Sequence, residues 1–114
     1  MDEALKIAYS NLEEDKTYVS DLKDYFIQQL KSVLPEASFN GSCSDKTNST
    51  YTLVNVCLPI APAKAAMLQF QLDLKGIACS RGSACQSGSN QQSHVLTEIL
   101  TEDKLKRPSI RFSF

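Results

Sequence analysis

One cysteine, Cys85, lies in a stretch of small and polar residues that runs from Ser80 to Ser93. Such a stretch has little apolar surface to bury, so we expect a hydrated, mobile loop that displays the thiol. A structural cysteine is usually a small buried hydrophobe, whereas an accessible thiol reacts according to its thiolate fraction. The pattern therefore predicts a reactive cysteine. The positive charge of Arg81 could lower the pKa of the Cys85 thiol. An arginine that is merely solvated on the loop is an equally good interpretation of Arg81.

The other three cysteines, Cys43, Cys57 and Cys79, are irregularly spaced, and the single histidine is His94. A zinc site favours close pairs such as C-x2-C, and a disulfide framework favours an oxidising compartment. Neither condition is met, so both kinds of site are disfavoured, and we expect Cys57 and Cys79 to be packed side chains. His94 could act as a base near Cys85, but we expect it to be a helix residue without a chemical role.

Composition indicates one soluble globular domain of 114 residues with a net charge of −1 and 42% hydrophobic residues. No basic run is present, which argues against a nucleic-acid partner. The apolar runs are shorter than the roughly 20 residues needed to cross a bilayer, so no membrane partner is expected. No charged-then-apolar signal opens the chain, and a cytoplasmic location is the default expectation.

Two amphipathic helices are predicted from apolar residues at helical spacing. The longer one carries a stripe from Leu5 to Val33 that we expect to pack on the core. It should end at Leu34, because the following proline disfavours helical geometry there. The second helix should cover 63–74, with an apolar face, and Gly76 is a plausible C-terminal cap.

The clearest strand is 51–58, which is β-branched and aromatic, and shorter strands are expected at 37–40, 77–79 and 109–114. A short helix should begin after Ser93, a candidate N-cap. The order of these elements predicts an α+β fold, with a small sheet of about three to four strands covered by helices.

Three blocks in this frame resemble the C-terminal part of the cysteine desulfurases. These are pyridoxal-phosphate enzymes of the class V aminotransferase superfamily. The blocks are Gly82-Ser83-Ala84-Cys85, Ser93-His94-Val95-Leu96 and Ser109-Ile110-Arg111-Phe112-Ser113. Upstream, Leu53-Val54-Asn55-Val56 is similar to the strand that precedes the cysteine segment in that family. The resemblance implies that 1–114 is a single, truncated C-terminal domain, the small domain of a fold-type I enzyme. The chain also ends on an apolar strand at Phe114, which favours a piece of a longer protein.

The resemblance implies a role for two residues. Cys85 matches the catalytic cysteine, which would take sulfur from L-cysteine as a persulfide and release alanine. The persulfide sulfur would then serve iron–sulfur cluster or thio-cofactor assembly. Arg111 matches the arginine that binds the substrate carboxylate, a task that suits a planar guanidinium. About five residues separate Cys85 from the expected strand at 77–79, which allows a reach on the order of 15 Å.

The resemblance also implies pyridoxal phosphate in the full-length enzyme, with L-cysteine and a sulfur-acceptor or scaffold protein as partners and a homodimer as the assembly. The lysine, the acidic group and the phosphate cradle for the cofactor lie upstream in that family, in the large domain. We therefore expect this chain alone to bind no cofactor, to bind no metal and to be inactive.

Two other interpretations remain open. The parent could be another class V enzyme, a selenocysteine lyase or an aminotransferase-like relative, although a transaminase has no need of a mobile cysteine. Alternatively, the chain could be a non-enzymatic carrier that takes sulfur from a partner through Cys85.

Overall fold

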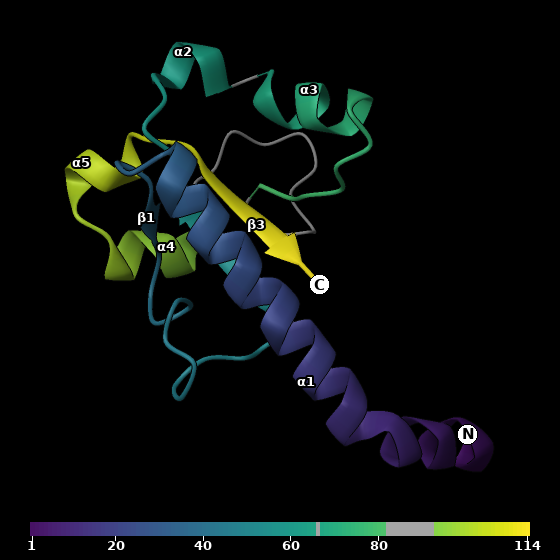
Figure 1. Ribbon diagram of the computed structural model, residues 1–114. Helices are drawn as coiled ribbons and strands as arrows, with labels where there is room; N and C mark the ends of the chain where they lie inside the picture. Colours follow the sequence, from purple (N-terminus) through teal and green to yellow (C-terminus); the bar gives the residue numbers. More distant parts are fainter. Residues whose placement is uncertain (66, 82–92) are drawn as a thin grey trace.

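The computed structural model describes residues 1–65, 67–81 and 93–114 (Figure 1). Its elements are α1 (Asp2–Val33), β1 (Ser38–Phe39), β2 (Leu53–Cys57), α2 (Pro62–Ala65), α3 (Leu68–Leu74), α4 (His94–Ile99), α5 (Glu102–Leu105) and β3 (Ser109–Ser113). The predicted α+β class is confirmed, with three strands in the sheet.

The sheet is antiparallel in the order β1-β2-β3, with Phe39 opposite Val56 and Val56 opposite Ile110. Side chains alternate between the faces of a strand, so Val54 and Val56 of β2 share one face with Ile110 of β3, whereas the buried Cys57 lies on the other face. Val54, Val56 and Ile110 have no exposed surface there and form the centre of the core. Helix α1 crosses this face (Figure 1), and the Phe26 ring lies 4.9 Å from that of Phe112.

Only the C-terminal half of α1 packs as predicted. Ile27 is buried, and Phe26 and Leu30 contact the core. All of the first eighteen residues are exposed, including Leu5 and Tyr9, so the expectation that the whole stripe packs is wrong. The reason is length: a helix of 32 residues spans about 48 Å, whereas a five-residue strand spans about 17 Å. The N-terminal end of α1 therefore projects beyond the sheet (Figure 1).

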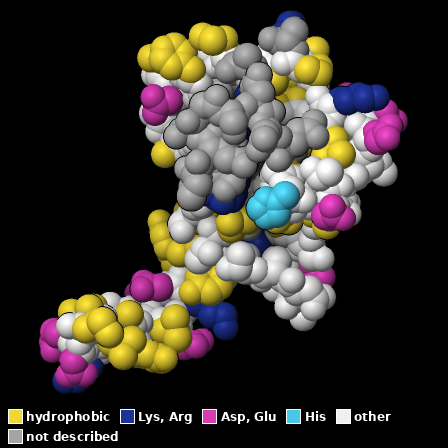
Figure 2. Space-filling view, turned by 180° about the vertical axis from the view of Figure 1, so that it is seen from behind, with side chains coloured by type: hydrophobic (Ala, Val, Ile, Leu, Met, Phe, Trp, Pro, Cys, Tyr) yellow, Lys and Arg dark blue, Asp and Glu magenta, His cyan; other side chains and the backbone are white. Residues whose placement is uncertain are grey.

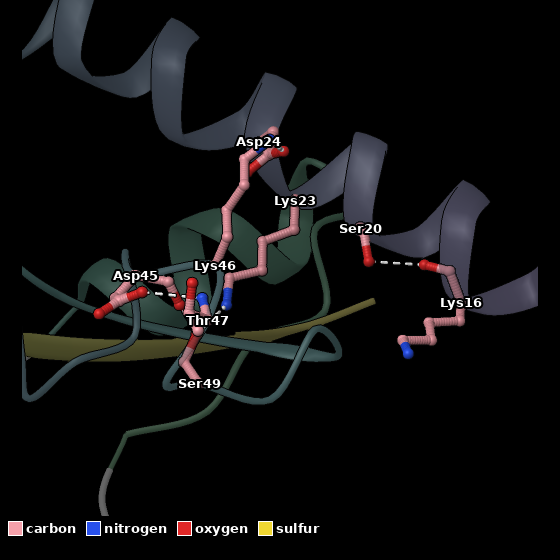
Figure 3. A network of polar contacts seen from close by, with 8 residues as sticks. All are labelled: Lys16, Ser20, Lys23, Asp24, Asp45, Lys46, Thr47 and Ser49. Carbon is pink, nitrogen blue, oxygen red and sulfur yellow. Dashed lines mark hydrogen bonds and ion pairs between the residues drawn. The ribbon is translucent and has the colours of Figure 1, made fainter.

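The polar loop between β1 and β2 is held to α1 by a buried lysine (Figure 3). The Lys23 ammonium donates to Ser49 Oγ at 2.9 Å and to the Thr50 carbonyl at 2.7 Å. Asp45 accepts from the Asn48 side chain and from two backbone amides, and these hydrogen bonds hold its carboxyl pKa below the ordinary value. An ion pair between Lys46 of the loop and Asp24 of α1 adds to this contact and raises the pKa of Lys46.

The second predicted helix is present as two short helices, α2 and α3, on either side of residue 66. Its apolar face is not buried: Met67, Phe70 and Leu74 are all more than half exposed. Figure 2 shows hydrophobic side chains at the surface over this part of the molecule. The helix instead contacts the core through Leu68 and Leu72.

The end of α3 is a glycine turn, as predicted. Gly76 has φ +76°, its amide donates to Asp73, and the Ile77 amide donates to Leu72. This pair of hydrogen bonds is the Schellman arrangement, in which glycine supplies the left-handed residue.

Two further expectations need correction. Residues 77–79 form no strand, and Ile77 is exposed; the strand-like pairing begins one residue later, at Ser80. The short helix α5 was not predicted, because four residues are too few for a helical period to be visible. The predicted N-cap of α4 is confirmed, since the Ser93 hydroxyl accepts from the Leu96 amide. Within the described ranges, no helix is both long and apolar enough to cross a bilayer.

Candidate functional site

Cys85, the predicted nucleophile, lies outside the described residues, but the structure describes the chain that leads to it. Ser80 forms an isolated antiparallel bridge with Arg111 of β3. The Ser80 amide donates to the Arg111 carbonyl at 3.0 Å, and the Arg111 amide donates back to Ser80 at 2.8 Å. The backbone five residues before Cys85 is thereby fixed beside Arg111. The structure brings together Arg111 and the start of the cysteine segment, which are far apart in the sequence.

Arg81 continues this anchor. Its Nη1 donates to the Ala65 carbonyl at 2.7 Å, near the end of α2. A helix leaves its last carbonyls without intrahelical partners, and a basic side chain can satisfy one of them. The guanidinium therefore ties the cysteine segment to α2, which neither sequence interpretation of Arg81 had anticipated.

Arg111 lies at the middle of β3, directly opposite Asn55 of β2. Both residues point away from α1, since they alternate with the core residues Ile110 and Val56. The Arg111 side chain is half-buried, and its Nε atom is enclosed without a hydrogen-bond partner. Among the described residues, no carboxylate pairs with it. Within the described residues, the Nε donor of its guanidinium is therefore unused.

A polar network covers the sheet beside Arg111. The buried Asn40 side chain donates from Nδ2 to Asn55 Oδ1 at 2.8 Å and to Ser109 Oγ at 2.9 Å. Cys43 is buried against the same strand, where its Sγ contacts the backbone nitrogen and oxygen of Asn55. The network links the residue that follows β1 to β2 and β3 near the candidate site.

Sequence reasoning missed this network. One signal was available: Asn55 interrupts a β-branched strand, and asparagine is depleted in strands. Its partners could not have been found, because Asn40 and Ser109 are 69 residues apart.

No family model matches the chain. Curated proteins do match. A cysteine desulfurase IscS from Dictyoglomus turgidum is 30% identical over 113 residues, which cover 99% of this chain and 27% of that protein. The IscS of Pseudoalteromonas translucida is 32% identical over 113 residues, or 26% of its length. The mitochondrial cysteine desulfurase of Drosophila melanogaster is 33% identical over 109 residues, or 22% of its length.

The chain is similar to part of a cysteine desulfurase. The matches cover almost all of this chain. They cover only part of each relative, since this chain spans about a quarter of the length of the curated desulfurases. The family resemblance inferred from the three sequence blocks is confirmed at this level.

Pyridoxal phosphate, which the desulfurase resemblance implies, is held through a lysine imine. Eight of the nine lysines of this chain are exposed on the surface. The ninth, Lys23, is buried, but its ammonium is engaged by Ser49 and Thr50. Within the described residues, no lysine is therefore placed to hold such a cofactor, and the residues present do not fit it.

The described thiols of the desulfurase-like chain are all free. Cys43 and Cys57 are buried, and Cys57 contacts the Lys104 carbonyl. Cys79 is partly buried against the core, and burial, followed by the negative charge of Asp73, raises its pKa. These environments suit packing, as predicted for Cys57 and Cys79. His94 opens α4 and is exposed. The described part of the chain contains no group of three metal-ligating side chains.

Proposed function

We propose that this chain is the C-terminal part of a cysteine desulfurase, in which Cys85 accepts sulfur and Arg111 binds the α-carboxylate of L-cysteine. The observation that carries the proposal is the Ser80–Arg111 bridge. It fixes the backbone five residues before Cys85 at the arginine. Five residues span at most about 18 Å when extended. The Cys85 sulfur can therefore reach a small substrate whose carboxylate is bound by Arg111.

The proposed reaction converts L-cysteine and the Cys85 thiol into alanine and a Cys85 persulfide. The substrate's Cβ–S bond breaks, a sulfur–sulfur bond forms at Cys85, and the Cβ carbon gains a hydrogen. Thiolate is the reactive form of the accepting cysteine. The persulfide sulfur would then pass to an acceptor or scaffold protein, for iron–sulfur cluster or thio-cofactor assembly.

Arg111 contributes binding and orientation. A carboxylate takes two parallel hydrogen bonds from a guanidinium, which fixes its plane as well as its position. The absence of a competing carboxylate among the described residues supports this role. Holding a reactant in place in this way converts a bimolecular encounter into an intramolecular one.

The remaining parts of the active site belong to the longer enzyme. The full-length protein would bind pyridoxal phosphate through residues outside this chain, would act as a homodimer, and would work in the cytoplasm. The 114 residues alone would be an inactive, truncated domain.

A chimera tests the proposal. The chain replaces the matching quarter of the Dictyoglomus turgidum desulfurase, and alanine and sulfide release from L-cysteine are measured. We expect activity in the chimera, loss of at least about a hundredfold in the Cys85→Ser variant, and an increase in KM of about tenfold or more in Arg111→Lys. Retained cofactor absorbance in both variants is the control for folding. A Cys85→Ser variant with full activity would refute the proposal.

A second measurement uses the 114-residue chain itself and does not depend on a folded chimera. Native protein is treated briefly with iodoacetamide, and alkylation of each cysteine is read by mass spectrometry. Cys85 should be modified first, and buried Cys43 and Cys57 last. Equal protection of Cys85 and Cys57 would contradict a displayed nucleophile.

The chimera also tests the alternative enzyme class. A preference of the chimera for selenocysteine over cysteine as substrate would favour a selenocysteine lyase.

A further inference from the structure

Asn55 and Arg111 form a close cross-strand pair on the polar face of the sheet. The two residues lie directly opposite each other in β2 and β3. The backbone amide and carbonyl of Arg111 are turned toward Ser80, on the far side of β3, and the Asn55 carbonyl accepts from the Asn40 amide, on the far side of β2. Such a pair is of the non-hydrogen-bonded kind, in which the Cα atoms lie only about 4.5 Å apart and the side chains are closest. The side chain at position 55 is therefore the immediate neighbour of the Arg111 side chain on β2.

The fold requires an oxygen at position 55 but not a neutral side chain. Asn40 is only 5% exposed, and its Nδ2 donates to Asn55 Oδ1 at 2.8 Å. A buried donor without an acceptor is destabilising, and aspartate would supply the same oxygen. Within the described residues, Asn55 Nδ2 has no acceptor that aspartate would forfeit. Aspartate would also pair with Arg111, and opposite charges across two strands are stabilising. Stability alone would therefore favour aspartate over asparagine.

Given the role proposed for Arg111 as the receptor of the substrate carboxylate, we propose that Asn55 is a positioning residue that keeps this arginine free. Its amide supplies the oxygen that Asn40 needs, without the charge that would occupy the guanidinium. Two observations on Arg111 support this role. Its Nε atom is enclosed without a partner, and among the described residues no carboxylate pairs with its guanidinium. The neutral residue opposite the arginine leaves its charge to the carboxylate of L-cysteine.

The size of the effect follows from competition for one guanidinium. A carboxylate at position 55 would compete with the substrate carboxylate from within the chain, and the apparent affinity for substrate falls in proportion to the fraction of protein in which Arg111 is free. An internal ion pair that forms in about nine-tenths of the molecules would raise the apparent dissociation constant about tenfold. The two carboxylates would also repel each other, since like charges at this separation are unfavourable. Both effects act on substrate binding.

The first test compares two substitutions in the chimera with the Dictyoglomus turgidum desulfurase. Asn55→Asp should raise KM for L-cysteine about tenfold or more, while kcat changes less than about threefold. Asn55→Ala leaves Arg111 unopposed and should change KM less than about threefold, although it removes the oxygen that Asn40 uses. Asn11→Asp makes the same amide-to-carboxylate change at an exposed position of α1 and is the matched control. Arg111→Lys is measured beside them.

The kinetic outcomes separate the role of Asn55 from that of Arg111. An unchanged KM in Asn55→Asp, together with the expected rise in Arg111→Lys, would overturn the role of Asn55 and leave the proposed function standing. Equal rises in Asn55→Asp and Asn55→Ala would also overturn it, because Asn55 would then act only through the stability of the fold. An unchanged KM in Arg111→Lys would refute carboxylate binding by Arg111 itself, and the role of Asn55 with it.

The second test uses the 114-residue chain and needs no turnover. Asn55→Ala should lower the urea midpoint of unfolding, because Asn40 loses its acceptor, whereas Asn55→Asp should not. The Nε–H resonance of Arg111, assigned by its loss in Arg111→Lys, should shift in nitrogen-15 NMR spectra of Asn55→Asp and not in those of Asn11→Asp. An unshifted resonance would overturn the proposal, because the new carboxylate would not reach the guanidinium. A midpoint for Asn55→Asp as low as that of Asn55→Ala would overturn it too, since the fold itself would then exclude aspartate.

Discussion

The two faces of the three-stranded sheet have opposite chemistry, although the same short strands build both. The face toward α1 is closed and apolar, with Val54, Val56 and Ile110 free of solvent. The other face carries Asn55, Ser109 and Arg111, with Asn40 directly after β1, joined by hydrogen bonds and cross-strand pairing, and it also holds the buried thiol of Cys57. One face thus supplies stability, and the other positions the groups that our proposal assigns to substrate. The difference indicates that the two tasks can be perturbed separately.

The largest expected effect comes from the apolar face. Ile110→Ala should lower the free energy of unfolding by about 2–5 kcal/mol, because it removes a fully buried side chain and leaves a cavity. Urea denaturation followed by circular dichroism measures this loss. Ser113→Ala, at an exposed position of the same strand, is the control. A loss below about 0.5 kcal/mol for Ile110→Ala would mean that this face is not the core.

On the polar face, the stability losses caused by separate substitutions should depend on one another. Asn40→Ala should cost about 1–3 kcal/mol, because it removes a buried amide and leaves the partly buried groups of Asn55 and Ser109 without that partner. In the double variant with Asn55→Ala, the combined loss should be smaller than the sum of the two, since both act through one hydrogen bond. Strictly additive losses would show that the network is not a unit.

Among the described residues, Lys23 carries a buried ammonium at the edge of the apolar layer, which allows a third comparison. Lys23→Ala should destabilise the chain by about 1–3 kcal/mol and speed hydrogen exchange in loop 43–50, which it anchors. Lys23→Met keeps the volume without the charge and should cost less. If methionine proved as damaging as alanine, the hydrogen bonds rather than the packing of the stem would dominate.

The smallest effect concerns Cys79, which is partly buried against the core. Burial raises its pKa, so its neutral thiol is favoured in the folded chain. Its alkylation rate should therefore rise at a higher pH than that of an unfolded peptide of the same sequence, and the difference should vanish in denaturant. Identical pH profiles for the two would contradict this environment.

The elements with local signals could be predicted from sequence. The end of α1 at Leu34, the turn at Gly76 and the cap at Ser93 each depend on neighbours within a few residues. Burial was harder to predict, because periodicity identifies an apolar face without saying what covers it. Leu5 and Phe70 both lie on correctly identified faces, and both are exposed.

The candidate site was only partly predictable, for a related reason. Arg111 was identified through the block of residues around it, but its setting depends on contacts between distant segments. Asn40 reaches Ser109 across 69 residues, and Arg81 reaches Ala65 across 16. No periodic pattern encodes such pairs, so the network beside the arginine and the tie to α2 emerged from the structure alone. Cys85 lies outside the described residues, and its role stays a prediction.

Arg81 is a fixed point of the chain ahead of Cys85, because its guanidinium is bound to the Ala65 carbonyl. Four residues farther along, the Cα atom of Cys85 must remain within about 14 Å of the Cα atom of Arg81. A group confined to so small a sphere meets its neighbours at an effective concentration in the millimolar range or above, whatever the dilution of the protein. Cleavage of the chain between these two residues would remove that advantage while leaving each side chain chemically intact.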